Sequence, residues 1–362
     1  MRDNARLSSS CGAHQLSEVQ APIECEVVIV GAGPCGLFQI FELGLLGMGA
    51  HVVDSLAHPG GQCTELYPDK PIYDIPALPV CGAQELIDRL MQQIKPFNAK
   101  FHLGQEVTEV RALAERLFFV RTTAGTVFHT RAIVIAGGVG SFQPRRLGME
   151  GAERFEGDQI HYRVKSAASF YGKDLVIFGG GDSALDWTLD LCGKARSLTL
   201  VHRRAEFKAA PASVARMREL VTAGRMRYVE GTATQLILAD DRVAGVEVHG
   251  TDGGAAHRLP AQQLLAFFGL HPKLGPIAQW GLDLDKRTIR VDTVKFETSV
   301  PGIFAIGDIN SYPGKKKLIL SGFHEAALAA FAIQHYIYPE KKQHLQYTTT
   351  SPIMQKRLGV AS

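Results

Sequence analysis

The residues best placed to do chemistry belong to a glycine-rich turn near the start of the chain. Gly31, Gly33 and Gly36 follow a β-branched apolar run at residues 24–30 and precede an apolar helical pattern. Such a turn lets the backbone approach a pyrophosphate and directs N–H groups and the positive end of a helix toward it. Asp54 ends the next apolar run, where a carboxylate can accept hydrogen bonds from both hydroxyls of an adenosine ribose. This spacing predicts an adenine dinucleotide site.

A second glycine turn begins at Gly179 with the pattern G-x-G-x-x-A, and the apolar run after it ends in His-Arg-Arg at 202–204 instead of in an acid. A carboxylate there would repel a 2′-phosphate, whereas arginine side chains bind one through charge-assisted hydrogen bonds. The change of charge favours NADP over NAD. The residues expected to bind NADP are Gly179, Gly181, Asp182, Ser183, Ala184, His202, Arg203, Arg204 and Lys208.

Two dinucleotide sites of opposite charge in one chain indicate that electrons pass from NADPH to a second, retained cofactor. FAD is the natural candidate, because a flavin accepts a hydride and can release electrons singly. The protein then supplies binding, orientation and electrostatics.

Two β-α-β units must position these turns. The predicted elements of the first are a strand at 24–30, a helix at 37–46 and a strand at 51–54; those of the second are a strand at 174–178, a helix ending near 192 and a strand at 197–201. Antiparallel hairpin patterns follow each unit, at 106–136 and at 226–248. The chain then returns to a strand at 302–306 and an alanine-rich helix at 321–336.

The order of these elements predicts the fold class and the domains. We expect an α/β protein with two Rossmann-like, three-layer ββα dinucleotide-binding domains, the NADP domain being inserted in the FAD domain. The predicted boundaries are a disordered N-terminal extension at 1–23, a discontinuous FAD domain at 24–145 and 267–340, an NADPH domain at 146–266 and a polar C-terminal tail at 341–362.

Length and composition agree with two globular domains. The chain has 362 residues, 46% of them hydrophobic, and 39 basic against 36 acidic residues, so its net charge of +3 gives no reason to expect nucleic-acid binding. The N-terminal stretch lacks an apolar signal region, and no apolar run is long enough to cross a membrane, so a cytoplasmic protein is expected. None of the six cysteines is in a C-x-x-C pair, so no metal site is expected.

Residues 24–340 resemble the pyridine nucleotide-disulphide oxidoreductase superfamily. Besides the two glycine turns, the resemblance rests on Gly-Gly-Gln at 60–62, Ala-Gly-Gly at 136–138, Gly-Leu-His-Pro at 269–272 and the Ala-Ile-Gly-Asp that ends at Asp308. The His-Arg-Arg element and the compact length are similar to the thioredoxin reductase branch. That branch has a C-x-x-C dithiol before the second glycine turn, but residues 161–171 here contain no cysteine. Thiol-disulphide exchange needs an attacking and a resolving sulfur, so this chemistry is not expected.

A narrower resemblance accounts for the missing dithiol. The chain resembles the thioredoxin reductase-like ferredoxin–NADP reductases, which keep the fold, lose the dithiol and add a C-terminal segment; the matching motifs end at Pro68, Trp187 and Pro352. The resemblance implies FAD and NADP(H) as cofactors, ferredoxin or flavodoxin as partner, and a homodimer. It places FAD contacts at Gly31, Gly33, Cys35, Gly36, Asp54, Gln62, Tyr67, Val107, Phe142, Asp308 and Thr349.

The resemblance also implies how the flavin is covered. Tyr67 is expected on one face and Tyr347, from the tail of the partner subunit, on the other, with Thr348 or Thr349 near the reactive edge. A tyrosine over the face that nicotinamide must reach has to move during turnover. Tyr67, Tyr347 and Thr348 are therefore the candidate catalytic residues.

Other interpretations remain open from the sequence. A disulphide reductase is disfavoured by the missing dithiol, with Cys63 as a lone thiol that is more simply a packing residue. An NADPH oxidase or quinone reductase would use the same flavin, and a redox sensor would bind both cofactors without turnover. Three basic clusters, 145–146, 315–317 and 341–342, are candidate docking charges for an acidic partner, or simply solvated surface.

Overall fold

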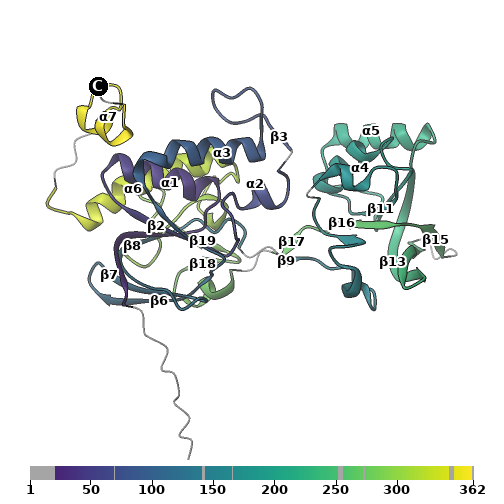
Figure 1. Ribbon diagram of the computed structural model, residues 1–362, viewed down its shortest axis with the longest axis horizontal. Helices are drawn as coiled ribbons and strands as arrows, with labels where there is room; N and C mark the ends of the chain where they lie inside the picture. The colour runs from purple at the N-terminus through teal and green to yellow at the C-terminus, as the bar shows by residue number, and fades with distance from the viewer. Residues whose placement is uncertain are drawn as a thin grey trace, which may run out of the picture.

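Two mixed β-sheets, each with a parallel core packed against helices, form two lobes in the computed structural model (Figure 1). The structure describes residues 21–68, 70–140, 143–164, 166–251, 256–271, 274–341 and 346–360. The first sheet takes strands from residues 23–135 and from residues 303–305, whereas the second takes its strands from residues 160–266. The predicted fold class, with one Rossmann-like unit inserted into another, is confirmed.

The first sheet has a parallel and an antiparallel part that share one strand. Its strands are β1 (Ile23–Val30), β2 (Ala50–Asp54), β5 (Lys100–Leu103), β6 (Val107–Ala114), β7 (Leu117–Thr122), β8 (Val127–Ile135) and β20 (Ile303–Ala305). Strands β5, β2, β1, β8 and β20 run parallel, and β7 and β6 continue antiparallel from the first half of β8. The first glycine turn therefore leaves the middle of the sheet, at the carboxyl end of β1, where α/β folds bind ligands.

Alternation along β1 puts its two faces into different cores. Val27 and Ile29 pack toward the helices, whereas Val28 packs toward the antiparallel strands. The helices are α1 (Pro34–Leu45), α3 (Ala83–Ile94) and α6 (Ile319–Ile337). Alanines line the buried side of α6, and their small side chains allow it to lie close to α1. The result is a three-layer ββα unit.

The second sheet repeats this plan. Its strands are β10 (Ile160–His161), β11 (Asp174–Phe178), β12 (Ser197–His202), β13 (Arg227–Ala239), β14 (Arg242–Gly250), β15 (His257–Pro260) and β16 (Gln263–Ala266). Strands β10, β16, β11, β12 and β13 run parallel, and β14 and β15 continue antiparallel. Helices α4 (Asp182–Leu191) and α5 (Pro211–Thr222) cover one face.

Shorter elements complete the chain. Strands β9 (Gln143–Pro144) and β17 (Leu270–His271) pair with each other and lie between the lobes (Figure 1). The others are α2 (Gln62–Glu65), β3 (Pro71–Ile72), β4 (Cys81–Gly82), β18 (Leu284–Asp285), β19 (Thr288–Arg290), β21 (Asn310–Ser311) and α7 (Pro352–Leu358). Of the helices in the described residues, none has the length and hydrophobicity that crossing a membrane requires.

The sequence located most elements to within a few residues. The first helix begins at Pro34, earlier than the predicted residue 37, because proline is well suited to the first turn of a helix. The sequence predicts a polar tail without indicating a helix in it, but the tail contains α7, whose N-cap residue is Ser351. The predicted N-terminal extension, apart from residues 21–23, lies outside the described residues.

A pair of histidines on neighbouring strands predicts acid sensitivity. His51 Nδ1 and His102 Nε2 are 2.9 Å apart, and their rings are stacked. Burial lowers the pKa of both imidazoles, and the neighbouring His102 lowers the pKa of His51 further. The unfolded chain therefore takes up these protons more readily, so stability is present above about pH 6.5 and is lost as pH falls below it.

We expect the double variant His51→Gln/His102→Gln to lose less stability than the wild type between pH 7 and pH 5. Urea unfolding at a series of pH values measures this difference. A variant whose free energy of unfolding falls with pH as steeply as that of the wild type would contradict the assignment.

Candidate functional site

The first glycine turn leaves open space where a ligand can approach the backbone. Gly31 has φ +113°, and a Cβ there would overlap the carbonyl of Ala136; a Cβ at Gly36 would overlap the carbonyl of Gly31. A Cβ at Gly33, by contrast, would have no atom within 4 Å. Two glycines thus close the turn against its surroundings, and the third faces a free volume at the N-terminal end of α1. This arrangement suits a pyrophosphate.

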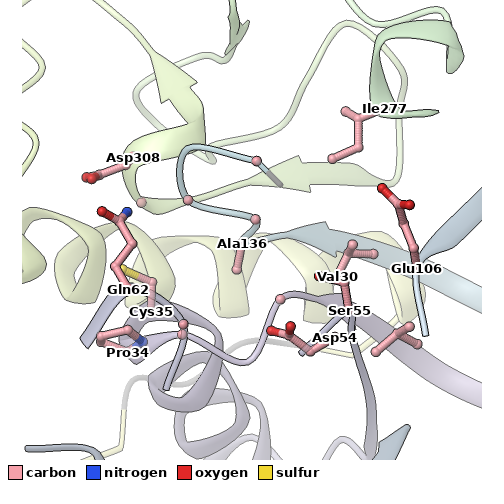
Figure 2. A pocket seen from close by; sticks show the side chains of 18 of the residues that line it. Val30, Pro34, Cys35, Asp54, Ser55, Gln62, Glu106, Ala136, Ile277 and Asp308 are labelled. Carbon is pink, nitrogen blue, oxygen red and sulfur yellow. The ribbon is translucent and has the colours of Figure 1, made fainter. Parts of the chain in front are cut away.

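A cleft extends from this turn in both directions (Figure 2). Asp54, Ser55 and Glu106 lie at one end, and Gln62, Cys35 and Asp308 gather at the other. Of the predicted FAD contacts, the structure brings to this cleft Gly31, Gly33, Cys35, Asp54, Gln62, Tyr67, Val107 and Asp308. Gly36 lies behind it, in the buried side of α1. Phe142 lies outside the described residues.

Asp54 is held in place by the backbone around it. Its Oδ2 accepts a hydrogen bond from Ala32 N at 2.6 Å, and its Oδ1 accepts one from Leu56 N at 2.8 Å. Burial raises the pKa of this carboxyl, and the two backbone hydrogen bonds oppose that rise. Each oxygen keeps a further lone pair, so the carboxylate can still accept bonds from two ribose hydroxyls.

At the other end of the cleft, the N-termini of two helices converge. Cys35, in the first turn of α1, has its Sγ against Gly322 in α6, where a Cβ would overlap it. Lys317 and Ile319, at the start of α6, also line the cleft. The positive ends of both helices therefore face the same space, and they would favour negative charge in it.

The cleft contains two thiols, and their surroundings raise the pKa of both. Cys63 is buried beside Tyr67, and burial raises its pKa to about 11. Burial likewise raises the pKa of Cys35 to about 12 and raises that of Tyr67. A thiol in this state is protonated at neutral pH and is unreactive. Cys63 is therefore best described as a packing residue, in agreement with the sequence interpretation.

The sequence did not identify several residues of the cleft wall. Ser55, Glu106, Leu274, Pro276, Ile277 and Lys317 line it without any recognisable motif. Lys317 belongs to the basic run 315–317, which the sequence indicates only as docking charges or as solvated surface. The segment 274–277 reaches the cleft through long-range folding, which no local pattern predicts.

The second glycine turn has the geometry of the first. Gly179 has φ +143°, and a Cβ there would lie 2.6 Å from the carbonyl oxygen of Phe267. A Cβ at Gly181 would meet nothing within 4 Å, as at Gly33. Ala184 is fully buried in the third position. The turn again leaves open space at a helix N-terminus, here that of α4.

The residues after β12 surround this second turn. The ring of His202 lies against Gly180, and the N–H of Lys208 donates to the carbonyl of Gly180 at 2.7 Å. Asp182 accepts a hydrogen bond from the N–H of Ala210 at 2.9 Å. The loop between β12 and α5 is thus fastened to the glycine turn, which fixes the loop's position beside it.

Three basic side chains of this loop are available to a ligand. Arg203, Arg204 and Lys208 are exposed, and none of them forms an ion pair with another of the described residues. Tyr228 donates its hydroxyl to the carbonyl of Arg204 at 3.1 Å, which orders the backbone beneath the arginines. The exposed Ser183 lies in the first turn of α4. Unpaired guanidinium groups at this point suit an anionic group such as a 2′-phosphate.

Ion pairs join the segment that carries Tyr67 to the second lobe. Lys70 Nζ is 2.7 Å from Asp186 Oδ2 on α4, and Arg163 pairs with Glu65. The two pairs stand on either side of Tyr67 in the sequence. They connect the cleft of the first lobe with the second lobe, and the Lys70–Asp186 pair reaches the helix that follows the second glycine turn.

The described residues of the tail, 341 and 346–360, do not line the cleft of their own chain. Helix α7 packs near the C-terminal end of α1, where Arg357 donates to the carbonyl of Leu45. The glycine turn is at the opposite end of α1. Tyr347 is 64% exposed, and neither it nor Thr348 or Thr349 lines the cleft.

One predicted docking charge is wrong. Lys315 was expected at the surface, but its side chain is only 7% exposed and pairs with Glu325. It faces inward because a buried carboxylate attracts it. The other charges of the three clusters, Arg145, Arg146, Lys316, Lys317 and Lys341, are exposed, and Lys342 lies outside the described residues.

Comparison with known proteins defines the class of protein. Residues 70–307 match the family described as pyridine nucleotide-disulphide oxidoreductase. The chain belongs to this family, as its sequence motifs predicted. A relative from Cupriavidus metallidurans, named ferredoxin–NADP reductase 2, is 60% identical over 94% of this chain and 92% of its own length. The ferredoxin–NADP reductase of Methylibium petroleiphilum is 59% identical over 99% of this chain and 97% of its own.

Solved structures support the fold. The thioredoxin reductase of T. acidophilum matches with a TM-score of 0.72 and 22% identity, over 88% of this chain and 99% of that one. The thioredoxin reductase of Lactococcus lactis matches with a TM-score of 0.72 and 21% identity, over 87% and 99%. At this identity the likeness concerns the architecture alone.

Proposed function

We propose that the protein is an FAD-dependent ferredoxin–NADP reductase. The observation that carries this proposal is the pair of glycine turns, the first followed by Asp54 and the second by Arg203 and Arg204. The names of relatives about 60% identical over nearly the whole chain agree with it. The net reaction oxidises one NADPH to NADP⁺ and a proton and reduces two ferredoxins by one electron each; it is reversible in principle.

The first cleft fits FAD. Open space at Gly33 accommodates a pyrophosphate, Asp54 can hold the adenosine ribose, and Asp308 and Gln62 lie toward the other end. Bound there, FAD would supply the conversion of a two-electron hydride transfer into single-electron transfers. The protein's own part is to hold the two cofactors in register and to exclude competing reactions.

The second turn fits NADP(H). Its open space at Gly181 receives the pyrophosphate, and the exposed arginines after β12 receive the 2′-phosphate. We expect no side chain of the cleft to act as an acid or base. Orientation of the two rings supplies a large part of the rate, because a fixed geometry removes the entropic cost of encounter.

The cysteines argue against disulphide reduction. Of the cleft thiols, Cys63 is buried and Cys35 is half-buried, and burial raises the pKa of both; Cys81 nearby is also buried. Neither of these two thiols has the lowered pKa that activates an attacking cysteine. No observation favours an NADPH oxidase, a quinone reductase or a redox sensor over the reductase.

A homodimer is the proposed assembly, with the tail of each subunit over the flavin of its partner. Tyr347, Ile353 and Val360 are exposed in the tail, where they are free to contact a partner subunit. Tyr67 would then lie on one face of the flavin, and Tyr347 of the partner subunit on the other. Flavodoxin as an alternative acceptor and a cytoplasmic location complete the proposal.

Removal of the residues after Gln346 tests the role of the tail. We expect a shifted flavin absorption spectrum, because an aromatic ring leaves the flavin face, and faster flavin reduction by NADPH, because nicotinamide no longer waits for that ring. Stopped-flow absorbance measures both. Tyr347→Phe is the matched control and should keep the wild-type spectrum. An unchanged spectrum and rate after truncation would refute the stacking role.

Ferredoxin-dependent electron transfer tests the function itself. Purified holoenzyme is given NADPH and cytochrome c, with and without ferredoxin. The proposal requires that ferredoxin accelerate cytochrome c reduction, since it carries electrons between the two proteins.

A further inference from the structure

A fully buried carboxylate organises the turn that carries Asp308. Glu325 on α6 has no exposed surface, and its oxygens accept bonds from Gly307 N at 2.7 Å, Asn310 Nδ2 at 2.8 Å and the Tyr312 hydroxyl at 2.9 Å. All three donors come from one short stretch of chain after β20. That stretch is therefore wrapped around a single side chain of the helix behind it.

A buried lysine completes this arrangement. Lys315 Nζ donates to Glu325 Oε1 and, at 2.9 Å, to the carbonyl of Gly307. Its side chain is 7% exposed. Burying an ion pair costs desolvation energy that the attraction between the charges often fails to recover. Such a pair is better explained by the geometry that it imposes than by net stability.

Asp308 lies in the chain between residues that bind Glu325, Gly307 and Asn310, but its own side chain takes no part in these hydrogen bonds. The N–H and the carbonyl of the preceding residue, Gly307, are bound to Glu325 and Lys315. The Asp308 carboxylate lines the cleft beside Gln62 (Figure 2) and has no hydrogen bond or ion pair within the described parts of the chain. Lys315, which binds the carbonyl of the preceding residue, is thus engaged by another carboxylate, that of Glu325.

We propose that Glu325 is a positioning residue for the cofactor in the cleft. It anchors the turn through Gly307 and retains the ammonium of Lys315, so that the Asp308 carboxylate stays free to bind the cofactor. Without the negative charge of Glu325, Lys315 is free to pair with the Asp308 carboxylate, which follows Gly307 directly in the chain, and to occupy its oxygens. The inference rests on FAD as the occupant of the cleft, which belongs to the proposed function.

Two substitutions separate this role from a general effect on folding. In Glu325→Gln one oxygen can still accept from Gly307 and Asn310, but the charge that holds Lys315 is lost. We expect the dissociation constant of FAD to rise at least about tenfold, which corresponds to about 1.4 kcal/mol. In Glu325→Gln/Lys315→Met the competing ammonium is also gone, so we expect FAD affinity to return to within about threefold of the wild type.

FAD binding is measured by quenching of flavin fluorescence on titration into the full-length apoprotein, with circular dichroism to report folding. Glu26→Gln is the matched control: Glu26 binds Gly49 N and the Tyr338 hydroxyl, near the other end of α6, and its loss should leave FAD affinity unchanged. A merely structural role predicts a double variant no better than the single one, and that result would overturn the proposal. So would wild-type affinity in Glu325→Gln.

If Glu325→Gln does not fold, the double variant alone decides: near-wild-type affinity supports the proposal, and a tenfold loss overturns it. The assay contains neither NADPH nor ferredoxin, so a failure of the reductase activity would leave its outcome unaffected. A wild-type apoprotein that binds no FAD would instead contradict the proposed function.

Discussion

Replacing Gly33 by valine is expected to abolish tight FAD binding while leaving the fold intact. Gly33 has φ −72° and ψ −179°, which valine adopts readily, and a Cβ there meets no protein atom within 4 Å. The added side chain would instead fill the space in which a pyrophosphate approaches the backbone. We expect FAD affinity to fall at least about 100-fold, or about 2.8 kcal/mol, and the stability of the apoprotein to change by no more than about 0.5 kcal/mol.

The second glycine turn supplies the matched control. Gly181→Val makes the same change at φ −100° and ψ 179°, also without a neighbour within 4 Å. It should leave the flavin bound and raise the KM for NADPH by a similar factor. Flavin content after gel filtration and steady-state kinetics separate the two losses. Loss of flavin in Gly181→Val, or its retention in Gly33→Val, would contradict the assignment of the two sites.

The double variant Arg203→Ala/Arg204→Ala is expected to lose preference for NADPH. Hydrogen bonds to charged groups contribute roughly 1.5–3 kcal/mol each. Among the described residues, no carboxylate forms an ion pair with these exposed arginines, so none competes with a bound phosphate. We expect kcat/KM for NADPH to fall about 100-fold and that for NADH to change by less than about threefold, because NADH lacks the 2′-phosphate.

Two exposed arginines on the outer strands of the same sheet provide the control. Arg242→Ala/Arg258→Ala makes the same change in net charge. Arg242, on β14, pairs with Asp158, and Arg258, on β15, pairs with Glu247. This control variant should leave kcat/KM unaltered for both NADPH and NADH. Equal losses with NADPH and NADH in the Arg203/Arg204 variant would contradict the 2′-phosphate assignment.

Those parts of the site that depend on local chemistry could be predicted from the sequence. The glycine turns were recognisable because each needs small residues at fixed spacing to close against its own neighbours, as the contacts of Gly31 and Gly36 illustrate. Asp54 was recognisable because it ends the strand that follows. The part of the cleft wall that includes Glu106 and Ile277 could not be recognised from the sequence. Its residues are far apart in the chain and meet only after the sheet has formed.

Lys315 illustrates the limit of reading charge from sequence. A run of three lysines is usually solvated, and only the fold brings the buried Glu325 against the first of them. The helix α7 was missed for a related reason. It has seven residues, only Met354 among them is buried, and so short a segment carries no apolar periodicity.

The central claim is that electrons from NADPH leave this protein singly, to ferredoxin. The most direct measurement is NADPH-driven reduction of cytochrome c by the purified holoenzyme, with increasing concentrations of ferredoxin. The account predicts a rate that rises with ferredoxin and saturates, and that collapses in Arg203→Ala/Arg204→Ala at low NADPH. A rate that does not depend on ferredoxin would contradict it.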